Sequence, residues 1–180
     1  MVKGAKRDTG RIPKTLPACE SCWILLTLAA HEKNAKSVAS VGFARLPLYF
    51  SHELLRDAKF VAVDRPPMPP LSALGLTQFT SFERGDYDGI TYFDTLFLKR
   101  GRVADESLYF HELIHLVQWR VLGPERFLAA YASGLEAFGY RNSPLESVAY
   151  DAQALFYRSN QVFDAEKLVA EKLSQMPTGV

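Results

Sequence analysis

The sequence predicts an α+β fold in which a small, mostly antiparallel sheet packs against a helical half. Short segments rich in β-branched and aromatic residues lie between residues 60 and 98, and Pro, Gly and Asp residues separate them, as turns separate strands. After Gly101 the apolar residues recur at helical spacing, and a capping residue precedes several of the runs. A length of 180 residues with 48% hydrophobic content fits one folded domain.

The first half of the chain mixes expected helices and strands. Residues 19–38 contain enough apolar side chains for a helix, and Ser51 is expected to cap a short helix that runs to about Ala58. A turn is expected at residues 85–89 because Gly and Asp dominate it. The expected strands occupy residues 60–63, 78–84 and 90–98.

The second half is expected to be entirely helical. Asp105 can cap a helix that runs to Leu122, and Gly123 follows as its stop. Asp164 is expected to cap the last helix, which ends near residue 175. Between them, helices are expected over residues 124–138 and 144–158, each opened by a proline.

The charge and hydropathy of the chain argue against nucleic-acid binding and against a membrane-spanning segment. Twenty-one basic and twenty acidic residues give a net charge of +1, which lacks the basic excess of nucleic-acid-binding proteins. The longest apolar run, residues 22–30, is far shorter than the roughly 20 residues of a membrane-spanning helix. Basic residues crowd the start, so residues 1–18 are expected to form a flexible basic tail before a single domain over residues 19–180.

Two cysteines, Cys19 and Cys22, form a lone Cys-x-x-Cys pair. A structural zinc ribbon uses four thiolates, and Pro17 leaves no room for the strand that precedes a thioredoxin-like redox site. We expect two reduced cysteines in or near a core helix. Because the start of the chain does not match a signal peptide, we expect a cytoplasmic location.

Residues 111–115 read His-Glu-Leu-Ile-His. On a helix His111 and His115 are one turn apart, so both imidazoles can bind one ion at about 2.0–2.1 Å. Glu112 lies beside that point and can accept a proton from a metal-bound water. The surrounding helix is apolar nearly all round, and a buried carboxylate there needs compensating charge. The sequence predicts one Zn²⁺ at this position, and two hydrogen-bonded core histidines are the alternative.

A catalytic zinc needs a third protein ligand, and two downstream glutamates compete for this role. Glu136 lies away from the apolar face of its helix and is expected to face solvent. Glu146 borders the apolar stripe of the helix that begins at Pro144, so we expect it to be the ligand. The alternative is a capping box, in which Glu146 returns a hydrogen bond to Ser143.

The stretch from Ile90 through Asp151 resembles the small gluzincin-type peptidases. In that family a strand leads to the His-Glu-x-x-His helix, and the ligand glutamate opens a later helix within an Asn-x-Pro-x-Glu-like context. Here that context is Asn142-Ser143-Pro144-Leu145-Glu146. The resemblance implies a zincin-like fold with zinc bound by His111, His115 and Glu146.

One position departs from the family pattern. Gluzincins commonly carry an acidic residue four positions after the ligand glutamate, where it orients a ligand histidine, and this chain has Tyr150 there. Asp151 projects in another direction on the helix. Gln118 or a backbone carbonyl can orient the histidine instead.

These features predict a zinc metallopeptidase that hydrolyses a peptide or protein substrate through a metal-activated water, with Glu112 as general base. Tyr150 joins Glu112 among the candidate catalytic residues. The strand over residues 90–98 can present an edge to an extended peptide. A non-catalytic zinc-binding interaction or scaffold module with the same fold is the alternative. The donors that can stabilise an oxyanion near Glu146 are Tyr140, Arg141, Tyr150 and Tyr157.

Overall fold

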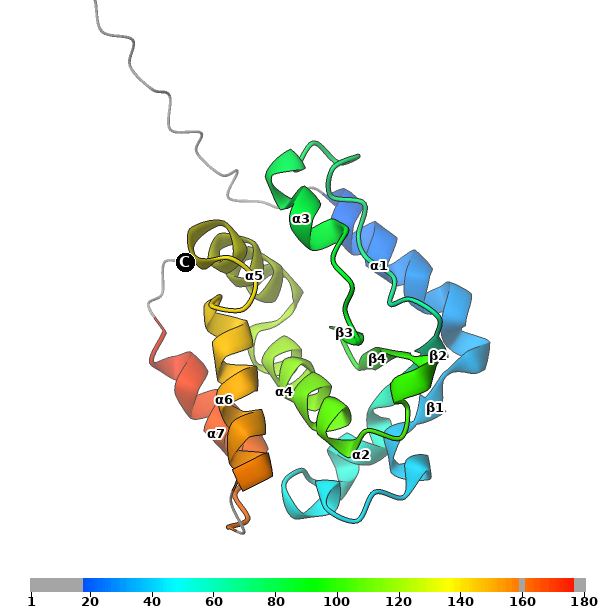
Figure 1. Ribbon diagram of the computed structural model, residues 1–180, viewed down its shortest axis with the longest axis vertical. Coiled ribbons are helices and arrows are strands. Elements are labelled where there is room, and N and C mark those ends of the chain that lie inside the picture. Colours follow the sequence, from blue (N-terminus) through cyan, green and yellow to red (C-terminus); the bar gives the residue numbers. More distant parts are fainter. Residues whose placement is uncertain (1–17, 159–160, 177–180) are drawn as a thin grey trace, which may run out of the picture.

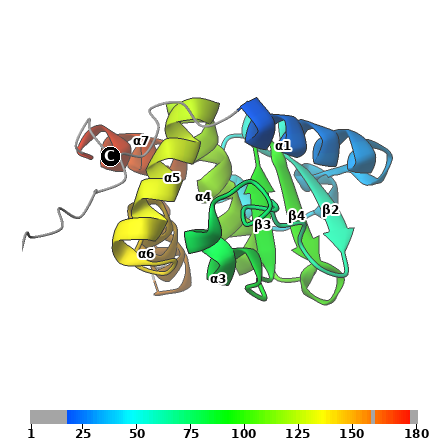
Figure 2. The same ribbon diagram turned by 90° about the horizontal axis from the view of Figure 1, so that it is seen from above.

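Helix α4 (Glu106–Leu122) lies at the centre of the molecule. The computed structural model describes residues 18–158 and 161–176. The sheet lies on one side of α4, and α6 (Pro144–Arg158) and α7 (Ala165–Ser174) lie on the other (Figure 1). A second view separates the helical half from the sheet half, which α1 (Ala18–His31) covers (Figure 2). The α+β class is therefore confirmed.

The sheet contains four strands in the order β1-β2-β4-β3. Strands β2 and β4 pair in parallel, whereas β1 with β2 and β3 with β4 pair antiparallel, so the mostly antiparallel sheet is confirmed. Strand β4 is central, and its first four residues are all buried. Strand β3 lies at the edge beside α4. The strand bounds are β1 (Lys36–Ser37), β2 (Lys59–Val63), β3 (Gly89–Tyr92) and β4 (Thr95–Lys99).

The single strand expected over residues 90–98 is wrong, because the chain folds there into the β3–β4 hairpin. Phe93 and Asp94 form the connection, and Phe93 has a φ of 55° in the left-handed region. Bulky residues rarely adopt that conformation, and turns that need it favour Gly or Asn. An uninterrupted run of strand-forming residues therefore concealed the turn.

The strand expected over residues 78–84 is also wrong. This segment forms a 3₁₀ turn (Thr77–Phe79) followed by the short helix α3 (Thr80–Glu83). The backbone N–H of Ser72 donates to Glu83 at 2.8 Å and holds the helix against the preceding loop. Phe79 and Phe82 are three residues apart, which is a helical spacing. The polar residues around them resemble the alternating pattern of a strand, so the helix was not predicted.

Helix α1 is shorter than the expected range of residues 19–38. It ends at His31, whose Nδ1 lies 3.1 Å from the carbonyl oxygen of Thr27. A 3₁₀ turn (Glu32–Asn34) and strand β1 follow. Cys22 is exposed on this helix, and the side chain of Cys19 lies outside the described part of the chain.

Three of the expected capping residues are confirmed, whereas the hydroxyl of Ser143, the expected cap of the helix from Pro144, has no hydrogen-bond partner among the described residues. Asp105 accepts hydrogen bonds from the first turn of α4, Asp164 accepts one from Lys167 in α7, and Ser51 caps α2 (His52–Asp57). Gly123 separates α4 from α5 (Pro124–Phe138) with a φ of 73°, which glycine adopts without strain. Local capping rules therefore placed the helix boundaries of the second half.

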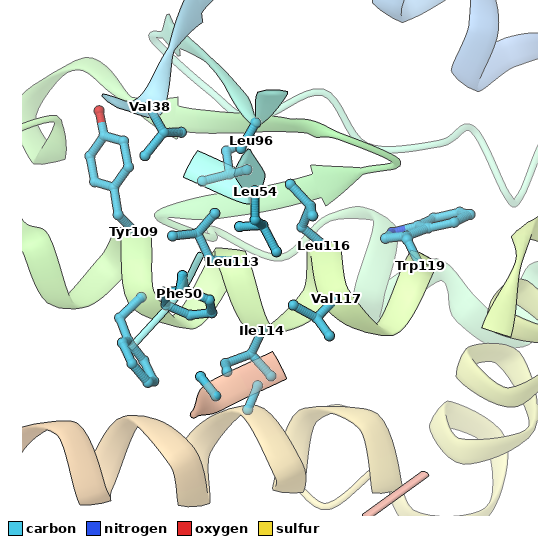
Figure 3. Close-up of a cluster of buried hydrophobic side chains, with 14 of the residues drawn as sticks. Val38, Phe50, Leu54, Leu96, Tyr109, Leu113, Ile114, Leu116, Val117 and Trp119 are labelled. Carbon is cyan, nitrogen blue, oxygen red and sulfur yellow. The ribbon is translucent and has the colours of Figure 1, made fainter. Parts of the chain in front are cut away.

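One continuous apolar core surrounds α4. Leu113 and Leu116 point toward the sheet, where they meet Leu96, and Ile114 points toward the helices on the opposite side (Figure 3). All four side chains are fully buried. Because apolar side chains pack on both sides of α4, the helix is buried. The polar residues of α4 are therefore held inside the protein.

No helix within residues 18–158 and 161–176 is long and apolar enough to cross a membrane. The predicted tail falls on residues 1–17, which lie outside the described residues, and on Ala18, which begins α1.

Helix α5 lies close to the start of α6 at Gly134, so a larger residue should not fit there without a shift. A Cβ atom at Gly134 would lie 2.9 Å from Cδ of Pro144 and 3.1 Å from Cβ of Ser143. Because the proline ring is rigid, Gly134→Ala should lower the free energy of unfolding by about 1–3 kcal/mol. Urea denaturation measures this change. Gly101→Ala is the matched control, since nothing lies within 4 Å of a Cβ there; equal stability of both variants would contradict the packing argument.

Candidate metal centre

The two histidines of the motif face one another on α4. They lie one turn apart, both are buried, and their Nε2 atoms are 3.2 Å apart. At this distance one neutral ring that carries its proton on Nε2 can donate to the other, and two rings whose Nε2 atoms are unprotonated can instead bind one metal ion. The helix thus places two ligand-type nitrogens at one point, as the spacing of His111 and His115 predicts.

Glu146 completes the group from the first turn of α6. Its Oε2 lies 3.5 Å from Nε2 of His111, and its Oε1 lies 3.4 Å from Nε2 of His115. One ligand atom from each of the three buried residues can be chosen so that all lie within 4.8 Å. Glu136 is exposed on α5, so Glu146 and not Glu136 lies with the two histidines.

The capping-box alternative is not realised. The hydroxyl of Ser143 has no hydrogen-bond partner, and its backbone N–H donates to the carbonyl of Tyr140 at 3.2 Å. The carboxylate of Glu146 is turned toward the histidines instead. Glu146 therefore contacts the histidines and does not take part in a capping box.

The spacing of these atoms is compatible with one small ion. Four ligands at about 2.0–2.1 Å from zinc lie about 3.3–3.4 Å from one another. The two Nε2 atoms are 3.2 Å apart, Nε2 of His115 lies 3.4 Å from Oε1 of Glu146, and Nε2 of His111 lies 3.5 Å from Oε2. Oε2 of Glu146 is buried with no hydrogen-bond partner among the described residues, so a metal ion would satisfy it. His111, His115 and Glu146 can therefore hold one metal ion.

Charge within the group is balanced by these same three residues. Burial lowers the pKa of His115, but the Glu146 charge and its hydrogen bond outweigh burial and raise that pKa to about 9. Burial raises the pKa of Glu146, and the two histidines outweigh burial and hold that pKa well below its usual range. Without metal, a proton on His115 thus partly replaces the positive charge that an ion would bring.

Gln118 orients His115. The side-chain oxygen of Gln118 lies 2.8 Å from Nδ1 of His115, and its amide nitrogen donates to the carbonyl of Leu145 at 2.9 Å. The second bond fixes which end of the amide faces the histidine, so Nδ1 carries the proton and Nε2 is left for a metal. Gln118 therefore serves as the orienting residue, while Asp151 is exposed.

Tyr131 contacts the carboxylate of Glu146, and the sequence did not predict this contact. Its hydroxyl donates to Oε1 of Glu146 at 2.6 Å, and its ring stacks on Phe127 of the same helix. In the sequence Tyr131 reads as one more apolar-face residue of α5. Its proximity to Glu146 depends on how α5 packs on α6, for which the sequence carries no signal.

Glu112 lies beside the ligands and is held by strand β3. The hydroxyl of Thr91 donates to Oε2 of Glu112 at 2.7 Å, and the indole N–H of Trp119 donates to the Thr91 carbonyl at 3.0 Å. Burial raises the pKa of Glu112, although both histidines and Thr91 lower it. A Cβ atom at Gly89 would lie 2.5 Å from Oε1 of Glu112. Sequence reasoning missed both Thr91 and Gly89.

Tyr150 also lies at the site. Its ring centroid is 4.7 Å from that of His111, and the guanidinium of Arg141 lies 4.9 Å from the centre of its ring. Burial, and then the charge of Glu146, raises the pKa of Tyr150. Of the other predicted donors, Tyr140 lines the adjoining cavity, whereas Arg141 and Tyr157 are exposed.

An apolar cavity of about 80 Å³ adjoins Glu112, His115 and Glu146. It lies between edge strand β3, helix α3 and helices α4 and α5. Its other lining residues are mainly aromatic and include Phe82, Tyr87, Ile90, Trp119, Phe127 and Tyr140. The group thus opens onto a space that can receive an apolar side chain.

No protein-family model, curated protein or solved structure matches the chain. Function is therefore inferred from the buried His-His-Glu group and the side chains around it.

Metal binding should depend on Glu146 and not on Glu136. Removing the carboxylate charge in Glu146→Gln leaves two ligands, so zinc affinity should fall at least about a hundredfold. Glu136→Gln is the matched control and should bind one zinc per chain as the natural protein does. Competition titration with a chromophoric chelator measures both. Equal affinities for the two variants would show that Glu146 is no ligand.

Tyr131→Phe should weaken zinc binding without unfolding the protein. Loss of an orienting partner typically costs 10-fold to 100-fold in metal affinity, and we expect about tenfold for this one hydroxyl. Tyr157→Phe, at an exposed position of α6, should have no effect. The same chelator titration measures the zinc affinity of both variants, and circular dichroism confirms that both variants fold. An unchanged affinity in Tyr131→Phe would contradict the positioning role.

Proposed function

We propose that the protein is a zinc-dependent metallopeptidase of the gluzincin kind. The observation that carries this proposal is the place of Glu112, which is buried beside the His-His-Glu group and borders a cavity. A purely structural metal site has no use for a second carboxylate in that position, and burying one costs free energy. A hydrolytic site, in contrast, needs a carboxylate at that position as its general base.

In this proposal His111, His115 and Glu146 hold the ion. Bound zinc lowers the pKa of a coordinated water toward neutrality and polarises a carbonyl oxygen. Glu112 accepts the proton of the attacking water and returns it to the leaving amine. The hydrogen bond from Thr91 keeps the Glu112 carboxylate oriented during both transfers.

The edge of the sheet supports a peptide as substrate. Strand β3 is the edge strand, and its residues Gly89, Ile90, Thr91 and Tyr92 all line the cavity. An extended peptide can add to such an edge through main-chain hydrogen bonds. We expect the substrate to place an apolar side chain in the cavity, because the lining beyond the ligands is mostly aromatic.

Tyr150 is proposed as the donor to the developing oxyanion. Its ring packs against ligand His111, and its raised pKa keeps the hydroxyl protonated and able to donate. Tyr140 lines the cavity and is the second candidate.

A non-catalytic zinc-binding module is the other candidate function. The burial of all three ligands favours it, since Glu146 is only 1% exposed and each histidine 6%. The two proposals differ in the fourth ligand: a water beside Glu112 belongs to the enzyme, and a protein group belongs to the structural site.

Glu112→Gln should separate the two functions. The variant should keep one zinc per chain, and its rate of peptide hydrolysis should fall at least about a hundredfold through loss of the general base. Mass spectrometry of a peptide library incubated with zinc-loaded protein measures cleavage. Gly89→Ala should also lower the rate, because the added Cβ displaces the Glu112 carboxylate but keeps its charge.

Glu136→Gln, on the exposed face of α5, is the control and should cleave normally. Cleavage by Glu112→Gln at the natural rate would overturn the mechanism. No cleavage by the zinc-loaded natural protein would favour the non-catalytic module.

A further inference from the structure

The candidate metal ligands are almost completely closed off from solvent. His111 and His115 are each 6% exposed, and Glu146 is 1% exposed. The cavity beside them holds about 80 Å³, whereas pockets that bind small molecules typically hold about 300–1,000 Å³. An extended peptide therefore cannot reach the ligands through this cavity unless one of its walls moves.

Most of the cavity wall belongs to the packed body of the protein. Strand β3, which is paired with β4, and helices α4, α5 and α6 supply it. The remaining wall includes Pro69 and Phe82, which belong to residues 65–85 between β2 and β3. We call residues 65–85 the cover segment. Its helix α3 lies at the boundary between the helical half and the sheet half (Figure 2).

Hydrogen bonds within the cover segment hold it together. The guanidinium of Arg65 donates to the carbonyl of Arg84 at 3.2 Å and to that of Gly85 at 3.3 Å, which joins the two ends of the segment. The bond from the backbone N–H of Ser72 to Glu83, at 2.8 Å, joins the middle of the segment to α3. A segment that packs on itself in this way can move as one body about its two ends.

The cover segment is attached less firmly to the rest of the protein. Within the part of the chain that the structure describes, one hydrogen bond links it to another element, from the hydroxyl of Tyr92 to the carbonyl of Pro67 at 2.8 Å. On the helical side, the ring of Phe82 lies 5.7 Å from that of Tyr131 and 5.8 Å from that of Tyr140, between centroids. Such apolar contacts are not directional, so they separate and form again without a change of fold.

We propose that the cover segment is a lid that opens as one body and controls access to the metal centre. When it is closed, Pro69 and Phe82 complete the cavity wall. When it opens, edge strand β3 and the carboxylate of Glu112 face solvent. The proposal concerns access to the three ligands, so it holds for a peptidase and for a non-catalytic zinc module.

Diethyl pyrocarbonate, which acylates histidine side chains, tests the proposal on the full chain without metal. His111 and His115 should react slowly, because the reagent reaches them only while the lid is open. Phe82→Ala removes the aromatic contacts and should speed their reaction at least about tenfold. Tyr92→Phe removes the hydrogen bond to Pro67 and should speed it about fivefold. Mass spectrometry of the digested protein locates the modified histidines.

Zinc exchange provides a second measurement. Because the ion passes the lid in both directions, Phe82→Ala should raise the rates of zinc uptake and zinc loss by the same factor and leave the affinity unchanged. If Phe82 only positioned Tyr131, its removal would raise the rate of loss alone and lower the affinity. Stopped-flow mixing with a fluorescent chelator measures both rates.

The matched controls remove the same types of side chain elsewhere. Phe138→Ala, at a position that is 56% exposed on α5, and Tyr157→Phe, at one that is 66% exposed on α6, should change neither measurement. His52 is exposed and should react at one rate in every variant. Thermal melting confirms that all variants are folded.

Three results would overturn the proposal. The first is reaction of His111 and His115 in the natural protein as fast as that of His52. The second is an unchanged reaction of these two histidines in both Phe82→Ala and Tyr92→Phe. The third is an unchanged rate of zinc uptake in Phe82→Ala, whether or not its affinity falls.

Discussion

The burial of helix α4 is the constraint on which the rest of the structure depends. Every residue from Ser107 to Trp119 is buried, with the sheet on one side and α6 and α7 on the other (Figure 1). Such burial removes each polar side chain of the helix from water, so each needs a partner inside the protein. The candidate metal centre supplies such partners for Glu112, His115 and Gln118.

The partners come from three different elements. Thr91 of β3 holds Glu112, Tyr131 of α5 holds Glu146, and the carbonyl of Leu145 in α6 anchors Gln118. Tertiary packing and site geometry are therefore inseparable here, because the contacts that close the core also orient the ligands. This explains why glycines occur at both close approaches, Gly89 beside Glu112 and Gly134 beside α6.

Residues whose roles follow from local rules could be predicted from the sequence. Helical spacing brought the two histidines together, and position on an amphipathic helix selected Glu146 over Glu136. Tyr131 and Thr91 could not be found, because their partners are distant in the chain and only the packing of α5 and β3 brings them close. The hairpin was missed because Phe93 takes a conformation that its residue type does not signal. The exposed leucines of α1 look like core residues in the sequence, since hydrophobicity does not record which side of a helix is covered.

The bond from Gln118 to Leu145 joins residues 27 positions apart in the chain. It ties the helix with the histidines to the first turn of α6, which carries Glu146, so the packing of the protein itself brings the three residues together. A preassembled site is selective, because it cannot rearrange to suit the ion. Magnesium and calcium need six or more oxygen ligands, and this pocket offers two nitrogens and one carboxylate. We therefore expect this donor set to bind small ions of low coordination number in preference to the abundant alkaline-earth ions.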